Sequence, residues 1–282
     1  KLGSLELGVG ETVHATRFSG DRLYVVTFLT IDPLWVVDLS DPRKPTLLGE
    51  LEVPGFSTYI EPLGDRLIAI GRVDSRTAVS LFDVSDPAAP TLLSQLPLGE
   101  GYSSSEANWD EKAFSVFPDD GLILVPYSGY DSASGWASRI QLIDLGRDGL
   151  IKRGIVDEGF AARRTAIVDD RILAISASAL ITVDFANRDH PVVTSDVEIA
   201  WRVDRVFLSG DYLVEIGGSA DWSRATPPSI TIATPDDPDA TVTLLELEDV
   251  PVTGATVRDG KLYLAQQNAG SYRATLGGGN SP

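Results

Sequence analysis

Short runs of aliphatic and β-branched residues, each bounded by Gly, Asp or Pro, recur along the chain. One such run follows a turn of Gly and Asp and appears six times. The copies are GDRLYVV (20–26), GDRLIAI (64–70), DGLILV (120–125), DDRILAI (169–175), GDYLVEI (210–216) and DGKLYL (259–264). Apolar runs of this length between Gly and Asp turns are typical of β-strands. The pattern predicts an all-β fold built by repetition.

A second apolar run follows most of these strands and is closed by Asp and Pro. It reads LWVVDLSDP at 34–42 and VSLFDVSDP at 79–87, then weakens to IQLIDL (140–145), LITVDF (180–185) and ITIA (230–233). An Asp recurs at one position of this run, at Asp38, Asp83, Asp144 and Asp184. Asp placed just before a turn accepts backbone hydrogen bonds, so we interpret this series as structural.

The spacing of the repeat indicates the architecture. Between equivalent positions 23, 67, 122, 172, 213 and 262 the intervals are 44, 55, 50, 41 and 49 residues. Periods of this length suit the blades of a β-propeller. The prediction is a six-bladed β-propeller of four-stranded antiparallel blades, forming one domain over residues 1–276 with a flexible tail at 277–282. The alternatives are seven or more blades, a fragment of a larger propeller, or two domains.

The two ends of the chain suggest how such a ring closes. Residues 2–7 (LGSLEL) read like the outer strand at 48–53 (LGELEV), whereas the last blade lacks an outer strand. We expect residues 2–7 to complete the last blade, so that the N- and C-terminal strands close the ring and hide its sheet edges.

Four segments carry a resemblance to a known family. They are residues 25–28, 32–42, 48–51 and 54–59. They resemble a family of secreted bacterial and archaeal β-propeller proteins distantly related to WD-repeat propellers, and the similarity extends to about residue 195. The segment at 110–114 matches too, but Glu111 stands where the family has His. The resemblance implies a propeller and a secreted or cell-envelope location, but no catalytic residues to carry over.

The composition of the chain excludes several kinds of partner and site. The 282 residues include 41 acidic and 23 basic side chains, a formal charge of −18, which disfavours a nucleic-acid partner. No apolar run is long enough to insert into a membrane, and residues 1–4 lack the features of a signal peptide. There is no cysteine and only two histidines, His14 and His190, which excludes disulfides, thiolates and His-rich metal sites.

The candidate binding residues are aromatic side chains in long loops. The loops between second and third strands share one propeller face with the connections between blades, and the longest are 98–112, 126–138 and 217–228. They carry six aromatic candidates: Tyr102, Trp109, Tyr127, Tyr130, Trp136 and Trp222. Aromatic rings beside acidic groups suit a carbohydrate or protein partner. The alternative is that these rings fold back over their own loops.

Catalysis and calcium are weaker hypotheses. A glycosidase or lyase needs two facing carboxylates, for which Glu106 and Asp131 are the pair to test. The acidic segments 131–135 and 236–239 offer oxygen ligands for calcium, yet neither matches a calcium loop and 236–239 reads as a blade turn. We therefore expect no cofactor or metal. The leading function is a non-catalytic binding propeller, followed by a carbohydrate-active enzyme and by a structural module of a larger envelope protein.

Overall fold

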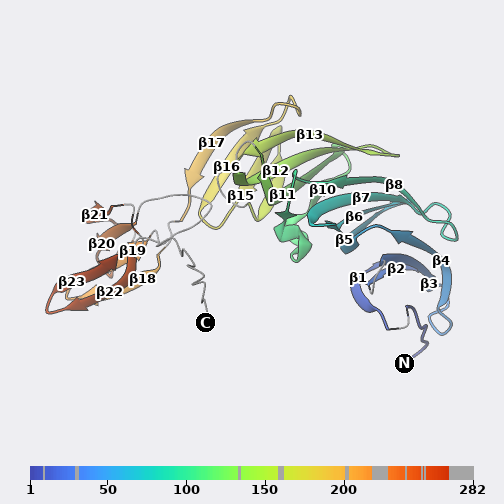
Figure 1. The fold of residues 1–282 in the computed structure, drawn as a ribbon, viewed down its shortest axis with the longest axis horizontal. Coiled ribbons are helices and arrows are strands. Elements are labelled where there is room, and N and C mark those ends of the chain that lie inside the picture. The colour runs from blue at the N-terminus through green and yellow to red at the C-terminus, as the bar shows by residue number, and fades with distance from the viewer. Residues whose placement is uncertain are drawn as a thin grey trace, which may run out of the picture. The chain divides into compact units, whose positions relative to one another are not determined.

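The computed structural model describes residues 1–8, 10–28, 32–132, 135–157, 162–200, 203–217, 228–238, 240–248, 250 and 252–266. The chain forms two compact units, Lys1–Ile199 (unit 1) and Ala200–Pro282 (unit 2). Both are built from antiparallel sheets (Figure 1). The described helices are two 3₁₀ turns, η1 (Glu106–Asn108) and η2 (Glu111–Ala113), so no helix among these residues could cross a membrane.

Unit 1 contains four sheets, each an antiparallel meander in chain order. Sheet 1 consists of β1 (Thr12–Ser19), β2 (Arg22–Phe28), β3 (Asp32–Asp38) and β4 (Thr46–Val53). Sheet 2 consists of β5 (Phe56–Leu63), β6 (Arg66–Val73), β7 (Arg76–Asp83) and β8 (Thr91–Pro97). Sheet 3 consists of β10 (Ser115–Phe117), β11 (Leu122–Asp131), β12 (Gly135–Leu145) and β13 (Leu150–Asp157), with β9 (Ser103–Ser104) beside β11. Sheet 4 consists of β14 (Arg164–Val168), β15 (Arg171–Ile175), β16 (Ala179–Asp184) and β17 (Val192–Glu198).

Unit 2 repeats the meander in one sheet and part of it in another. The first has β18 (Arg205–Ser209), β19 (Tyr212–Gly217), β20 (Ser229–Ala233) and β21 (Thr243–Glu246). The second has two strands, β22 (Val252–Arg258) and β23 (Lys261–Gln266). All six repeated runs are therefore strands, namely β2, β6, β11, β15, β19 and β23, and the second run forms β3, β7, β12, β16 and β20. The prediction of four-stranded antiparallel sheets is confirmed for four of the six sheets, and sheet 3 contains the same four-stranded meander with β9 added.

Apolar side chains join each sheet of unit 1 to the next. One core cluster combines sheets 1 and 2, including Tyr24, Val36 and Leu67. A second combines sheets 2 and 3, and a third combines sheets 3 and 4. The middle strands of sheet 2 are buried on both faces, which explains why the run GDRLIAI is continuously apolar rather than alternating.

The sheets are also joined at one end, which we call the turn end. This end carries the turn between the first and second strands and the turn between the third and fourth. Arg22 reaches from sheet 1 to the carbonyl of Val84 in sheet 2. Arg66 reaches from sheet 2 to Asp148 in sheet 3, with 2.7 Å between Nη2 and Oδ1. The Arg of the repeated GDR turn therefore binds the neighbouring sheet.

Sheet 4 makes the equivalent connection in the opposite direction. Nη1 of Arg188, in the turn before β17, lies 2.6 Å from Oδ1 of Asp144 in sheet 3. Its Nη2 donates to the carbonyl of Asp120, at 2.6 Å. Asp144 therefore anchors an arginine of sheet 4, which is a structural role different from the turn acceptor predicted for the Asp series.

Glycine permits a close approach between two outer strands, β4 and β13, and the next sheet. A Cβ on Gly154 of β13 would lie 2.5 Å from Cδ of Pro191 in the third turn of sheet 4. Gly49 of β4 meets the carbonyl of Pro87 in sheet 2 in the same way. Gly3 lies equally close to sheet 1, since a Cβ on it would be 2.7 Å from the carbonyl oxygen of Pro42.

The N-terminal segment corrects one expectation. Residues 2–7 form no strand, and no sheet of the described residues contains them, so the expected pairing with the last sheet is not confirmed. The segment lies against the Asp-Pro turn of sheet 1, at the place that β4 takes beside sheet 2.

Candidate functional site

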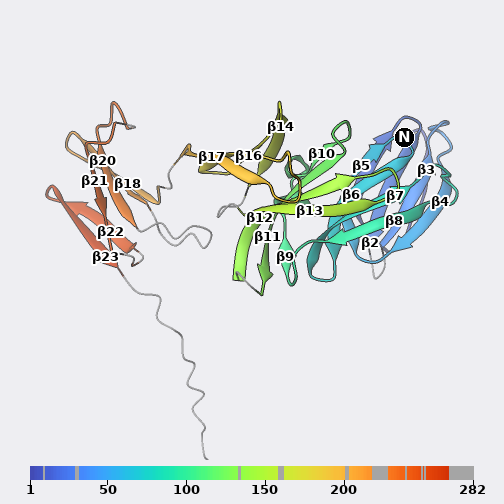
Figure 2. The same ribbon diagram turned by 90° about the horizontal axis from the view of Figure 1, so that it is seen from above.

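The opposite end of the sheets, which we call the loop end, is irregular, and its largest feature is the hairpin of β11 and β12. Residues 126–138 are not the loop that the sequence suggested, because the ladder continues to the pair Asp131 and Gly135. β9 pairs with Ser128 and Gly129 and lies beside β11 (Figure 2). Glu100 accepts two hydrogen bonds from Ser132, at 3.0 Å and 2.8 Å. Segment 98–104 is thus held along a regular hairpin.

A buried polar network fixes the base of this segment. Oδ1 of Asn108 accepts from Thr77 Oγ1 at 3.0 Å and from the amide of Ser105 at 3.2 Å. Its Nδ2 donates to the carbonyl of Gly71 at 3.0 Å. Ser103 adds a second link, accepting from the amide of Thr77 at 2.9 Å. Both side chains are buried, so the connection between sheets 2 and 3 is rigid where it leaves β8.

Four side chains at the loop end form what we call the aromatic patch: Arg72, Tyr102, Tyr130 and Trp136. The rings of Tyr102 and Trp136 are stacked, with centroids 6.0 Å apart and planes 24° apart. The Arg72 guanidinium lies over the Tyr102 ring, 5.2 Å from its centroid. Tyr130 is directly opposite Trp136 in the ladder. The three rings are 50–54% exposed although they are held by strands and by each other.

The structure separates the six predicted aromatic residues. It brings Tyr102, Tyr130 and Trp136 together. Trp109 is 68% exposed and ends η1, apart from the stacked pair. Tyr127 is 4% exposed and belongs to the core between sheets 2 and 3, so its ring covers the hairpin base as the alternative interpretation held. Trp222 lies outside the described residues.

Arg72 is the member of the patch that the sequence analysis missed. It follows the apolar run of β6 and was not assigned to a loop. Strand direction could have predicted its position, because β6 and β8 end at the same end of sheet 2, where the long loop begins. Nη2 of Arg72 donates to the carbonyl of Ser75 at 3.1 Å, which holds the guanidinium at this end.

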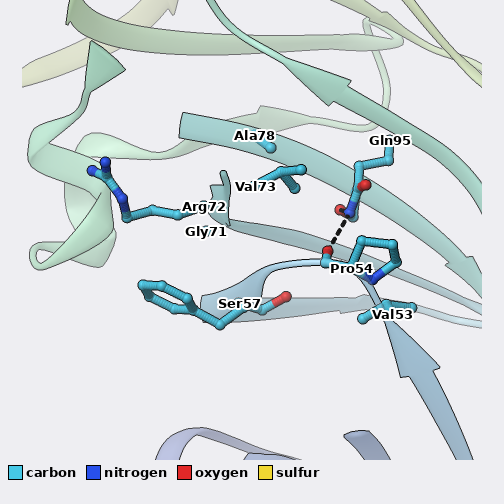
Figure 3. Close-up of a pocket in the computed structure, with 10 residues that line it drawn as sticks. Val53, Pro54, Ser57, Gly71, Arg72, Val73, Ala78 and Gln95 are labelled. Carbon is cyan, nitrogen blue, oxygen red and sulfur yellow. Dashed lines mark hydrogen bonds between the residues drawn. The ribbon is translucent and has the colours of Figure 1, made fainter. Parts of the chain in front are cut away.

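A small cavity below Arg72 is too narrow for a ligand. It lies between β4 and sheet 2 and has a volume of about 10 Å³, room for one water molecule at most. Gln95 points across it and donates to the carbonyl of Pro54 at 3.1 Å, whereas Arg72 extends away from this pair (Figure 3). The binding surface is therefore the exposed patch and not this cavity.

The acidic candidates do not assemble into a site that the described residues define. Glu106 begins η1 and is partly exposed, and the side chain of Asp131 lies outside the described residues. Asp236 and Asp237 lie in the turn after β20, as expected for a blade turn. Among the side chains described, no group of three His, Cys, Asp or Glu residues is placed to hold a metal ion.

The repeated Asp residues are held as carboxylates by their own turns. Hydrogen bonds from Ser40 lower the pKa of Asp38, first its backbone amide and then its hydroxyl. The hydroxyl of Ser85, followed by its backbone amide, lowers the pKa of Asp83. The amide of Ala186 and then Arg171 lower the pKa of Asp184. These residues are therefore turn acceptors, which confirms the structural interpretation.

One acidic residue at the loop end has a different partner. Oδ2 of Asp110 lies 2.6 Å from Nη2 of Arg164, and this bond, followed by the amide of Lys112, lowers the pKa of Asp110. The pair connects η2 to β14 of sheet 4. Its neighbour Glu111 replaces the family's His, but the contact to sheet 4 is made by Asp110.

Comparisons with known proteins give a family and uncharacterized relatives. The model of a family described as beta propeller domain matches residues 1–168. An uncharacterized protein of Methanocaldococcus jannaschii is 42% identical over 124 residues, covering 42% of this chain and 20% of that protein. An uncharacterized protein of Archaeoglobus fulgidus is 30% identical over 152 residues, covering 54% of this chain and 24% of that protein. The chain thus spans no more than about a quarter of either relative.

Comparison with solved structures gives matches of low similarity. A putative 6-phosphogluconolactonase from Bacteroides fragilis has 12% identity and a TM-score of 0.42, covering 89% of this chain and 76% of its own. The computationally designed Ika4 protein has 13% identity and a TM-score of 0.41, covering 63% and 92%. At these values neither structure informs the activity of this chain.

Proposed function

The chain belongs to the beta propeller domain family, and on that premise we propose that it is a non-catalytic binding protein whose loop end holds a protein partner. The observation that carries the proposal is the aromatic patch, in which three half-exposed rings and one arginine are held in place before any partner arrives. Trp, Tyr and Arg are the residues that most often dominate protein interfaces.

Rigidity supports this role. The rings extend from a paired hairpin and from a segment anchored by Asn108, so binding would cost little side-chain ordering. The stacked pair also keeps half of each ring in water, which leaves apolar area to be buried by a partner. An exposed surface of this kind suits a macromolecule more than a small molecule, which needs a concave site.

Site-specific crosslinking tests the proposal. A photoreactive amino acid in place of Tyr130 leaves the Tyr102 and Trp136 stack intact. In cells that produce the protein, we expect a discrete protein adduct that disappears when Trp136→Ala is added. The same photoreactive residue at Tyr212, which is 51% exposed on β19, is the matched control. Equal adducts at positions 130 and 212, or adducts that survive Trp136→Ala, would overturn the proposal.

Two further outcomes identify the competing functions. Binding of purified envelope polysaccharide that depends on Trp136 would replace the protein partner by a carbohydrate. Hydrolysis or cleavage of such a polysaccharide that collapses in Glu106→Gln would replace binding by catalysis. Fractionation of the same cells tests the location, which we propose to be secreted or cell-envelope because the resembled family is exported.

We also propose that the six sheets are the blades of one propeller domain over residues 1–276. The repeat at near-constant spacing supports this number, and each sheet begins its second strand with the same turn. Calorimetry tests it, because one domain unfolds in a single cooperative transition. Two transitions, one of them reproduced by residues 1–199 alone, would favour two domains.

A further inference from the structure

A cavity of about 470 Å³ lies between the first strands of sheets 2, 3 and 4, away from the aromatic patch. Its walls come from β5, from β10 with its flanking residues, and from β14. The lining residues are Tyr59, Glu61, Leu63, Phe114, Ser115, Val116, Phe117, Pro118, Thr165, Ala166 and Ile167. The volume is within the range of small-molecule sites.

The polar groups of this cavity offer acceptors and no spare protons. The Tyr59 hydroxyl donates to Glu61. The Thr165 hydroxyl donates to Ser115 Oγ at 2.8 Å, and the Ser115 hydroxyl donates to the carbonyl of Thr165 at 3.1 Å. Each hydroxyl proton is therefore already bonded within the protein, which leaves the oxygen atoms of Tyr59 and Thr165, two residues that line the cavity, as acceptors. A ligand there must supply the hydrogen-bond donors.

The charge of Glu61 is neutralised from outside the cavity. Arg17 of β1 donates to Glu61 Oε2 at 2.9 Å, and its guanidinium lies 5.3 Å from the centroid of the Tyr59 ring. Arg17 and Tyr59 both donate to Oε2 of Glu61, so Oε1 accepts no hydrogen bond from the described residues. Burial, and then the bond to Glu61, raises the pKa of Tyr59, which keeps its hydroxyl protonated.

The remaining wall is apolar. Leu63, Phe117 and Ile167 line it, and Phe114 meets the Tyr59 ring edge-on with centroids 6.2 Å apart. Hydrogen-bond acceptors, apolar side chains and no unpaired charge in one cavity match one ligand class. We propose that this cavity binds a neutral, hydroxyl-rich small molecule, of which a mono- or disaccharide is the closest common example.

Other ligand classes fit the cavity less well. An anion would face the oxygens of Glu61, Thr165 and Tyr59 without a donor to bind it. An ammonium ligand would find the one carboxylate already paired with Arg17 and the Tyr59 ring already beside that guanidinium. A purely apolar ligand would leave the acceptors without partners, which is costly in a partly closed site.

Calorimetric titration of the whole chain tests the assignment. The probes are glucose, N-acetylglucosamine, maltose and myo-inositol as neutral hydroxyl-rich molecules, putrescine as an amine, and gluconate as an anion. We expect at least one neutral probe to bind with a Kd of about 1 mM or lower, and neither charged probe to bind at about 10 mM. No binding by any neutral probe, or tighter binding by putrescine or gluconate, would overturn the assignment.

Variants then locate the site. Ile167→Trp adds bulk on the strand face of Thr165 without removing a polar group, and we expect it to abolish binding. Thr165→Val removes one acceptor at nearly constant volume and should weaken binding about tenfold. Val168→Phe, on the same strand but outside the lining, should bind normally, and melting curves show that each variant is folded. Binding retained by a folded Ile167→Trp would refute this location.

The aromatic patch provides the final control. Trp136→Ala should leave the affinity of the neutral probe unchanged, because Trp136 does not line this cavity. Loss of probe binding in Trp136→Ala would move the sugar site to the loop end and overturn this inference.

Discussion

The two ends of the sheets in unit 1 differ in how far they repeat. At the turn end, sheets 1, 2 and 4 each carry an Asp that accepts from its own turn, and sheets 1 and 2 each carry an Arg that reaches the next sheet. At the loop end, sheet 3 alone carries the long hairpin, and the segment before it is held by a network centred on Asn108. The contacts that recur between sheets stabilise the fold, whereas the hairpin that occurs once is the place to look for a partner site.

Acidification should destabilise the turn end more than any of the substitutions below. The pKa values of Asp38, Asp83 and Asp184 are lowered in the fold, so their stabilisation is fully present above the ordinary aspartate pKa of about 3.9 and is lost as the pH falls through the lowered values. We expect the melting temperature to fall steadily below about pH 4, by more than any single substitution below achieves.

The comparison with Asp83→Asn makes this prediction specific. The variant should melt at a lower temperature at neutral pH and lose less on acidification, because one of the three groups no longer titrates. Scans in about 1 M NaCl reduce the effect of the net charge. A wild type and variant with parallel pH curves would show that the Asp series does not contribute.

Asn108→Ala should be the most damaging single change at the loop end. It leaves Thr77, the Ser105 amide and the Gly71 carbonyl without their buried partner, which costs about 2 kcal/mol in free energy of unfolding. Urea denaturation measures the loss. Asn187→Ala, at an exposed turn position, is the matched control and should change stability by less than half as much.

Arg188→Ala should cost less, about 1 kcal/mol, because the arginine remains partly in solvent. It removes the bonds to Asp144 and to the Asp120 carbonyl that join sheets 3 and 4. The same denaturation experiment measures it. A loss equal to that of Asn108→Ala would mean that the two ends contribute alike.

Trp136→Ala should have the smallest effect on stability, within about 0.5 kcal/mol, because half of the side chain is already in water. Thermal melting compared with Tyr212→Ala tests this. A loss of several degrees beyond the control would show that the patch is a structural cover rather than a binding surface.

The repeat made most of the fold predictable. Each GDR-type turn gave a strand because its geometry is local: Gly64 adopts φ +64°, and Asp169 adopts φ +53° at the matching position, a conformation that Asp tolerates. Sequence similarity could not establish the closing strand. Residues 2–7 and 48–53 both contact an Asp-Pro turn of the following sheet, but of the two only 48–53 pairs with a strand in the described residues. The loop prediction for 126–138 was wrong because Gly and Ser residues are typical of loops, although here they belong to the paired strands β11 and β12.

The candidate site was predictable only in part. Exposure of Tyr102, Tyr130 and Trp136 follows from their place at one end of the sheets. Burial of Tyr127 depends on alternation along β11, which a loop interpretation ignores. The inner cavity had no sequence signal, because its walls come from three strands whose residues are ordinary until the sheets bring them together.

The close approach at Gly3, Gly49 and Gly154 limits how such sheets can be exchanged. Each of the three faces an Asp- or Pro-containing turn of the following sheet. The equivalent residue of β8 is Ser94, and the turn of sheet 3, residues 146–149, contains no proline. A duplicated or grafted sheet would therefore fit only before a neighbour whose turn suits its outer strand. One position of the outer strand therefore restricts which sheet can follow another, even where the apolar cores of the sheets are interchangeable.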